Sequence, residues 1–163
     1  MFAYTSLTSF SGDLSNLTNG EWMFIRTALT SFNGDLSNLV NGRGMFSNTA
    51  LTSFNGDLSN LYDGRNMFYY TSLTSFSGDL SNLINGDDMF HSTKLNKESV
   101  TNIINCLKNS NTCSTATSLT LGIDASLKTD TELQTLLGIT EGATSTTLTG
   151  HGGGTWSIKL QWN

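Results

Sequence analysis

The sequence predicts a β-rich solenoid of stacked repeats that ends in a small α+β cap, and three observations support this prediction. A Met-Phe pair recurs every 22 residues, each unit contains a segment in which apolar and polar residues alternate, and the pattern changes after Leu95. The repeats begin at Met1, Met23, Met45, Met67 and Met89. Because this period lies in the range of about 20 to 29 residues, we expect a leucine-rich-repeat solenoid in residues 1–95 and an α+β C-terminal cap in residues 96–163.

Four repeats are complete, and their shared columns are too many to arise by chance. Met, Phe, Thr, Leu, Gly, Asp, Ser and Asn each hold fixed places in every unit. A chain of 163 residues is one domain long, so we expect all repeats to share one continuous core. The four units read MFAYTSLTSFSGDLSNLTNGEW, MFIRTALTSFNGDLSNLVNGRG, MFSNTALTSFNGDLSNLYDGRN and MFYYTSLTSFSGDLSNLINGDD.

The first element expected in each unit is a strand, near residues 8–14 of the first repeat. There Thr8, Phe10, Gly12 and Leu14 alternate with polar residues, which is the period of a strand with one buried face. Turns stacked about 4.8 Å apart would pair each strand with its neighbour. They would also build ladders of identical buried side chains, Phe10, Phe32, Phe54 and Phe76 in one ladder and Leu14, Leu36, Leu58 and Leu80 in another.

The rest of each unit is expected to return the chain to the next strand. In the first repeat, Leu17 precedes an Asn19–Gly20 pair, which tolerates the positive φ angles of a reversing turn. The Met-Phe step and the Leu six residues after Met would then form a short helical or irregular turn. Their apolar side chains would meet Phe10, Leu14 and Leu17 inside the coil.

The C-terminal cap is expected to contain two helices and two strands. A first helix is predicted after Asn96, whose side chain can cap it. Its apolar residues recur at helical spacing and are Val100, Ile103, Ile104 and Leu107. A strand is expected near residues 118–124, a second helix between a Thr129 cap and Gly138, and a final strand in residues 155–162.

The motif MFxxTxLTSF, followed by DLSNL and NG, resembles the BspA-like leucine-rich repeats of bacterial surface and phage-associated proteins. The resemblance covers residues 1 to about 95. This chain departs from the family pattern in two columns: Thr5 and its counterparts stand where Cys is frequent, and Gly12 and its counterparts stand where a second aliphatic residue is usual. The resemblance implies adhesion and the binding of proteins or glycans, and it brings no catalytic residues.

Composition excludes several classes of function. The net charge of -5 and the pI near 4.7 argue against nucleic-acid binding. The chain contains no apolar run approaching the roughly 18 residues of a membrane span, so membrane insertion is not expected. The first ten residues of the chain as given lack the basic start and apolar stretch of a secretory signal peptide. An extracellular, cell-surface or virion location is nevertheless favoured.

An acidic row is expected on the strand face, formed by Asp13, Asp35, Asp57 and Asp79. Carboxylates stacked at the repeat distance repel one another by about 1 kcal/mol in water, so something should relieve the repulsion. One explanation is that each Asp accepts a backbone N–H bond in its turn or points into solvent. The other is a site for Ca²⁺ or sugar hydroxyls. The neighbouring Asn16, Asn38, Asn60 and Asn82 are expected to be buried and to bond the backbone.

The columns beside the Met-Phe step differ from repeat to repeat, and we call them the variable edge. Large aromatic and basic residues of this kind suit binding sites, although drift at unconstrained surface positions would produce the same pattern. The candidate binding residues are Tyr4, Trp22, Arg26, Arg43, Arg65, Tyr69 and Tyr70.

Two further features bear on assembly and redox state. Met1 begins directly in a repeat, so an N-terminal portion has been removed or another chain covers that end, through a two-fold pair or a head-to-tail stack. Cys106 and Cys113 are too few for a zinc site. They either form a disulfide that staples the first cap helix to the next loop or remain unpaired thiols.

An enzymatic role is not expected, and neither is a cofactor or metal. The Gly-, Ser- and Thr-rich segment 139–154 is predicted as a mobile loop, and its HGGG stretch at His151–Gly154 has no G-x-S-x-G nucleophile elbow to accompany it. We therefore expect a non-enzymatic recognition or adhesion module that binds a protein or glycan. The alternative is a structural protein of a fibre or particle that assembles with itself through its open N-terminal end.

Overall fold

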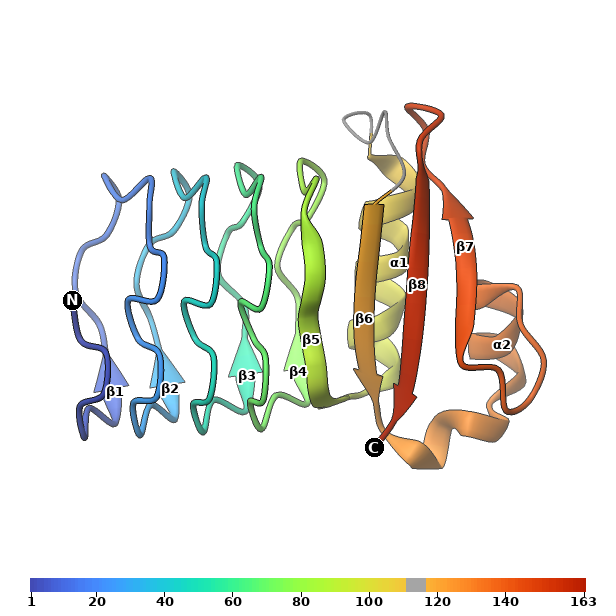
Figure 1. Cartoon of the computed structure of the whole chain (residues 1–163), viewed down its shortest axis with the longest axis horizontal. Helices are drawn as coiled ribbons and strands as arrows, with labels where there is room; N and C mark the ends of the chain where they lie inside the picture. The colour runs from blue at the N-terminus through green and yellow to red at the C-terminus, as the bar shows by residue number, and fades with distance from the viewer. Residues whose placement is uncertain (111–116) are drawn as a thin grey trace.

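The structure is a computed structural model, and it describes residues 1–110 and 117–163. The chain is β-rich, with short parallel strand pairs along the repeats and longer strands with helices after them. In Figure 1 the repeats stand side by side in chain order, with the N-terminus at one end and the helices at the other. The four repeat strands are β1 (Ser9–Phe10), β2 (Ser31–Phe32), β3 (Ser53–Phe54) and β4 (Ser75–Phe76).

The repeat strands are shorter than the alternating pattern predicted. The strand expected over residues 8–14 is wrong in extent, because only Ser9–Phe10 is regular strand. After it the ring of Phe10 folds against Gly12, where a Cβ atom would lie 2.6 Å from Phe10 Cζ. Asp13 then accepts the backbone N–H of the residue two positions later, which withdraws that donor from any ladder and bends the chain.

Neighbouring repeats pair in parallel and in a register of one repeat. Ser9 faces Ser31 across β1 and β2, and Ser53 faces Ser75 across β3 and β4. Thr8, expected to point inward, is exposed instead. Its carbonyl accepts hydrogen bonds from the backbone N–H and the hydroxyl of Thr30 in the next repeat, at 2.9 and 3.1 Å. The Thr column therefore serves the ladder rather than the core.

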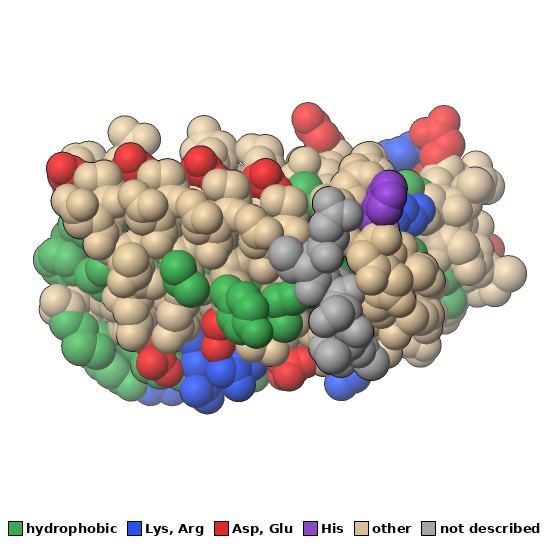
Figure 2. Space-filling model, turned by 90° about the horizontal axis from the view of Figure 1, so that it is seen from above, with side chains coloured by type: hydrophobic (Ala, Val, Ile, Leu, Met, Phe, Trp, Pro, Cys, Tyr) green, Lys and Arg blue, Asp and Glu red, His purple; other side chains and the backbone are tan. Residues whose placement is uncertain are grey.

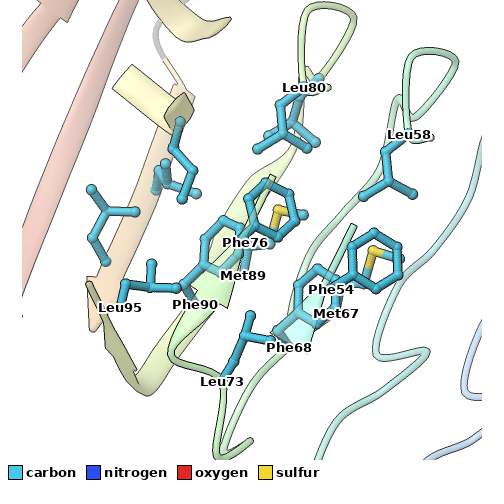
Figure 3. Close-up of a cluster of buried hydrophobic side chains, with 14 of the residues drawn as sticks. Phe54, Leu58, Met67, Phe68, Leu73, Phe76, Leu80, Met89, Phe90 and Leu95 are labelled. Atoms are coloured by element: carbon cyan, nitrogen blue, oxygen red, sulfur yellow. The ribbon is translucent and has the colours of Figure 1, made fainter. Parts of the chain in front are cut away.

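The core contains two interleaved ladders of phenylalanine. Phe24 and Phe46 stack with centroids 5.7 Å apart and planes 3° apart, and Phe32 meets Phe46 edge-on at 4.8 Å. Figure 3 shows how this arrangement continues through later repeats, where Met67 and Leu73 join the rings. The predicted ladder of Phe10, Phe32, Phe54 and Phe76 is confirmed, because successive rings stack with centroids 5.7–6.2 Å apart. Edge-to-face contacts between the two Phe ladders add about 0.5–1.5 kcal/mol per pair beyond apolar burial.

The tight turns of each repeat lie at different residues from those predicted. Positive φ angles were expected at pairs such as Asn19–Gly20, but neither residue has one. The glycine is required by packing instead, since a Cβ on Gly20 would lie 2.8 Å from Met45 Sδ. Left-handed backbone occurs on both sides of each Met-Phe pair, at Trp22, Gly44, Asn66 and Asp88 before it and at Tyr4, Arg26, Asn48, Tyr70 and Ser92 after it.

The fifth repeat joins the C-terminal sheet. Its strand β5 (Gly86–Leu95) pairs in parallel with β6 (Thr117–Ile123), which is followed by β8 (Thr155–Trp162) and β7 (Ser145–Thr149) in the order β5-β6-β8-β7. The strands expected near 118–124 and over 155–162 are confirmed. The segment 139–154, predicted as a mobile loop, instead contains β7, which pairs antiparallel with β8 and gains its backbone partners there.

Helix α1 (Lys97–Asn109) begins where predicted, with the Asn96 side chain accepting the N–H of Ser99 at 2.9 Å. It packs against β4 and closes the backbone ladder on the strand side. The N–H of Phe76 donates to Ser99 Oγ at 2.8 Å, and the amide of Asn102 donates to the carbonyl of Gly78 at 3.1 Å. Side chains of α1 thus take the place that a further repeat strand would occupy.

The second predicted helix is present but starts one residue later than expected. Its N-cap is Asp130, which accepts the N–H of Leu133 at 2.8 Å, because Thr129 already belongs to the 3₁₀ helix η1 (Ala125–Thr129). Helix α2 (Thr131–Leu137) then ends at Gly138, whose φ of 66° confirms the expected glycine stop. Figure 1 shows α2 beside β7, at the end of the molecule opposite the N-terminus.

Candidate binding surfaces

The acidic row is exposed, and each of its carboxylates is bonded to its own turn. Oδ1 of each Asp accepts the N–H of the Ser two residues later at 2.8–2.9 Å. Hydrogen bonds from the side chain and the backbone of Ser15 lower the pKa of Asp13. Hydrogen bonds from the backbone and the side chain of Ser37 lower the pKa of Asp35 in the same way. The described residues contain no group of three or more His, Cys, Asp or Glu side chains placed to hold a metal ion.

The adjoining Asn column bonds the preceding repeat, as expected, but from an exposed position. The side-chain amide of Asn38 donates to the carbonyl of Ser15 at 2.8 Å, and that of Asn60 donates to Ser37 at 2.7 Å. The prediction that these residues are buried is wrong, because the bonded carbonyls lie at the outer side of the turn. The Asp and Asn columns on this side therefore both bond the main chain.

The variable edge contains a shallow depression with a volume of about 240 Å³. Four of the seven predicted binding residues line it, namely Tyr4, Trp22, Arg26 and Tyr69. The others that line it are Ile25, Ser47, Asn48 and Asn66, from the same variable columns. Figure 2 shows basic, acidic and hydrophobic side chains along the side of the repeats opposite the acidic row. Ser47 and Gly44 are buried, which differs from the expectation that all variable positions are exposed.

Two of the three arginines on the edge have acidic partners. Arg65 forms a hydrogen-bonded ion pair with Asp63, with Nε 3.0 Å from Oδ1. Partial burial opposes ionisation of Asp63, but the bonds from Arg65 outweigh it and keep the pKa of Asp63 below its usual value. Arg43 lies 3.6 Å from Glu21 and over the ring of Trp22, 5.6 Å from its centroid.

The third arginine, Arg26, differs in its surroundings. Its guanidinium lies over the ring of Tyr4, 5.7 Å from the centroid, and the residue is exposed. Within residues 1–110 and 117–163, no carboxylate lies within salt-bridge distance of Arg26. The residues that line the depression include no Asp or Glu.

An aromatic cluster continues the edge beyond the depression. Tyr69 and Tyr70 meet edge-on at 4.8 Å, and His91 stacks on Tyr69 at 4.9 Å. Sequence reasoning missed His91, although it occupies the same column of the fifth repeat as Tyr69 does of the fourth. The 22-residue period places His91 in this column, but the fifth unit departs from the repeat pattern after Leu95 and was therefore not searched for binding residues.

After each of the first four Met-Phe pairs, a backbone N–H group on the edge donates to a carbonyl of the next repeat. The N–H of Tyr4 donates to Ile25, that of Arg26 to Ser47 and that of Asn48 to Tyr69, at 2.8–2.9 Å. Tyr70 continues the series with a 3.0 Å bond to His91. The backbone N–H groups at these positions are therefore bonded without help from the side chains.

A second hollow region, absent from the sequence predictions, lies between the loop after β4 and α1. Two adjoining hollows of about 440 and 390 Å³ share Ser77, Asn102 and Asn105, and the larger one also contacts Asp79 and Cys106. Cys106 is a half-buried free thiol whose pKa is raised by burial. Its predicted disulfide partner, Cys113, lies outside the described residues.

The first repeat presents apolar side chains at the N-terminal end of the stack. Met1 is 86% exposed, and Phe2, Phe10 and Leu14 are half-buried, whereas Phe24 and its later counterparts are fully buried. At the other end of the repeats, β6 and α1 cover the corresponding surface. The two ends of the repeat region are therefore chemically different.

Comparison of the chain with protein-family models, with curated proteins and with solved structures finds no match. In the part of the chain that the structure describes, no helix has the length and apolar character needed to cross a bilayer. The geometry of the surfaces above is therefore the basis for the functional proposal.

Proposed function

We propose that this protein is a leucine-rich-repeat solenoid of BspA-like type that recognises a protein or glycan, without catalysis, through its variable edge. The observation that carries the proposal is the depression at that edge. Aromatic faces, an arginine without an acidic partner and side-chain amides converge there from successive repeats. Sites that bind ligands combine apolar surface with a few polar groups in this way, and Tyr, Trp and Arg dominate binding energetics.

The contrast between the two long sides supports the edge over the acidic row. Each Asp of the acidic row is bonded to its own turn, so its column is explained by the fold alone. The N–H groups of Trp22, Arg26 and Tyr69 donate to backbone carbonyls, so main-chain hydrogen bonding does not explain why these large side chains occupy their positions. A binding role accounts for these large side chains at positions of left-handed backbone or close to them.

The test is a binding screen with matched variants. The wild-type chain is applied to arrays of immobilised glycans and of surface proteins, beside an edge variant (Trp22→Ala with Tyr70→Ala) and an acidic-row variant (Asp35→Asn with Asp57→Asn). Binding that the edge variant loses and the acidic-row variant keeps is the expected result. Binding lost only in the acidic-row variant would move the site to the strand face and overturn the proposal.

Self-assembly is the second candidate, and the half-exposed apolar ring of the first repeat favours it. Because β6 and α1 cover the other end of the repeats, this alternative takes the form of two N-terminal ends facing each other. Light scattering from nanomolar to high micromolar concentration tests it. A rise from monomer mass to dimer mass that Phe10→Ser abolishes would support pairing, and a constant monomer mass would exclude it.

A further inference from the structure

We propose that the ligand of the depression is an acidic saccharide, with its carboxylate on Arg26 and its ring against the aromatic walls. This inference rests on the proposed function, because it names the ligand class of the same site. Three aromatic residues line the depression together with Arg26, whose guanidinium lies over the ring of Tyr4. Ser47, Asn48 and Asn66 also line it.

The unpaired charge indicates an anionic ligand. Arg43 and Arg65 lie beside Glu21 and Asp63, so most of their charge is compensated within the protein. Among the described residues, the guanidinium of Arg26 is placed over the ring of Tyr4 and forms no salt bridge, and no carboxylate lines the depression. A guanidinium presents parallel N–H donors that match the two oxygens of a carboxylate, which gives the strongest kind of hydrogen bond available here.

The engaged backbone argues against an extended peptide. A peptide that adds to a sheet edge needs free N–H and C=O groups in register. On this edge the N–H groups of Tyr4, Arg26 and Asn48 already donate to carbonyls of the next repeat. A peptide strand would therefore find no row of free donors here, and side chains would have to provide most of the recognition.

The side chains that remain match a sugar ring. A sugar ring has an apolar face of C–H groups that packs on aromatic rings, and hydroxyl groups around its rim that both donate and accept hydrogen bonds. Tyr4 is 69% exposed and offers ring surface, while Asn48 and Asn66 carry amides that donate and accept. A volume of about 240 Å³ lies below the roughly 300–1,000 Å³ of drug-sized ligand pockets, so it suits a ring-sized unit.

The experiment titrates the whole chain with three probes of matched length. They are an oligogalacturonate, which carries one carboxylate per ring, a neutral galactan oligosaccharide and an oligoglutamate peptide. Calorimetry gives the affinity, and the difference in tryptophan fluorescence between the wild type and Trp22→Phe reports on Trp22, because the other two tryptophans, Trp156 and Trp162, lie on β8. Saturable binding of oligogalacturonate, with at least about tenfold weaker binding of the other two probes, is the expected result.

Single variants locate the contacts. Arg26→Gln should weaken oligogalacturonate binding about tenfold, because it removes a charged hydrogen bond, and raised salt should weaken binding to the wild type. Lys159→Gln removes one positive charge from an exposed position on β8 and should leave affinity unchanged. Trp22→Phe should abolish the fluorescence change while keeping affinity within about threefold, since an aromatic wall remains. Unchanged thermal unfolding confirms that the variants are folded.

The outcomes separate this inference from the proposed function. If the peptide or the neutral saccharide binds as tightly as oligogalacturonate, or if Arg26→Gln changes nothing, the acidic-saccharide inference is overturned. If oligogalacturonate does not bind at millimolar concentration while the array screen still shows edge-dependent binding, the inference fails and the proposed function stands. If edge variants alter neither experiment, both fail.

Discussion

The side chains on the two long sides of the repeat region differ in how they contact the main chain. On the strand side, Asp13 and its counterparts bond their own turns, and Asn38 and its counterparts bond the preceding repeat. On the variable edge, the N–H groups of Tyr4 and Arg26 donate to carbonyls of the next repeat, and the side chains change from one repeat to the next. The constant Asp and Asn columns therefore bond the main chain, whereas the side chains at Tyr4 and Arg26 are not needed for the main-chain bonds of their own N–H groups.

The difference extends to backbone conformation. The edge contains Tyr4, Trp22, Arg26 and Tyr70 at positive φ, a region that costs L-residues about 1–2 kcal/mol. Glycine would relieve this cost at each position, and only Gly44 does so among the residues immediately before the Met-Phe pairs. Large side chains are thus retained on the edge against local preference, which is typical of positions kept for binding.

The core beneath both sides should show the largest effect. Phe46 is fully buried and contacts four other rings, so Phe46→Ala should lower the free energy of unfolding by about 3–5 kcal/mol. Phe10→Ala, in the half-buried first repeat, should cost clearly less. Urea unfolding followed by circular dichroism measures both. Equal losses at the two positions would show that the first repeat is as well covered in solution as the second and third.

A second substitution, Gly44→Ala, should disturb the packing of the variable edge. At Gly44, with φ of 60°, an added Cβ would lie 1.9 Å from the Trp22 ring, so Gly44→Ala should displace Trp22 and destabilise the chain by about 2–3 kcal/mol. Gly153→Ala is the control, because it has φ of 83° and nothing within 4 Å of the added atom. It should cost only the backbone term of about 1 kcal/mol. Similar losses for both would mean that Trp22 does not rest on Gly44.

A matched pair of glycine substitutions in the second repeat compares the two sides directly. Arg26→Gly removes a residue from left-handed backbone and should leave stability within about 0.5 kcal/mol or raise it slightly. Thr30→Gly removes the hydroxyl that donates to Thr8 and loosens the strand side, so it should cost about 1–2 kcal/mol. Thermal unfolding ranks the two. The reverse order would contradict the assignment of backbone strain to the edge.

Acid should weaken the strand side as well, although by the smallest amount of the four effects. The folded pKa values of Asp13 and Asp35 lie below their ordinary value of about 3.9, so these groups contribute stability above that pH and lose it as the pH falls through the folded pKa. Unfolding midpoints measured between pH 6 and about pH 3 should therefore decrease. The double variant Asp13→Asn with Asp35→Asn should show a shallower decrease, and an unchanged slope would contradict the role of these carboxylates.

The period of the sequence predicted the parts of the fold that depend on repetition. The Phe ladders follow from identical residues 22 positions apart, and α1 follows from a capping Asn96 before apolar residues at helical spacing. Strand β5 was not predicted, because its residues form turns in the other repeats. It becomes a strand where β6 runs beside it, and it retains positive φ angles at Asp88 and Ser92 and irregular register.

The candidate site was only partly predictable for a similar reason. Variation between repeats indicated Tyr4, Trp22 and Arg26, because positions that vary are those where the fold does not require one particular residue. Which arginine lacks an acidic partner depends on how the columns align across repeats, and that requires the structure. Segment 139–154 was misread because its Ser, Thr and Gly content is typical of a loop, and only the partner strand β8 makes part of it β7.

The one-repeat register described above has a consequence for how such a gene can change. Each repeat contacts its neighbours through the same columns, so removal of residues 23–44 would join the first repeat to the third with equivalent partners across the new junction. Recombination between coding units for such repeats would thus lengthen or shorten the protein in whole turns. Each event would add or delete one row of the variable edge, while the C-terminal cap would remain unchanged.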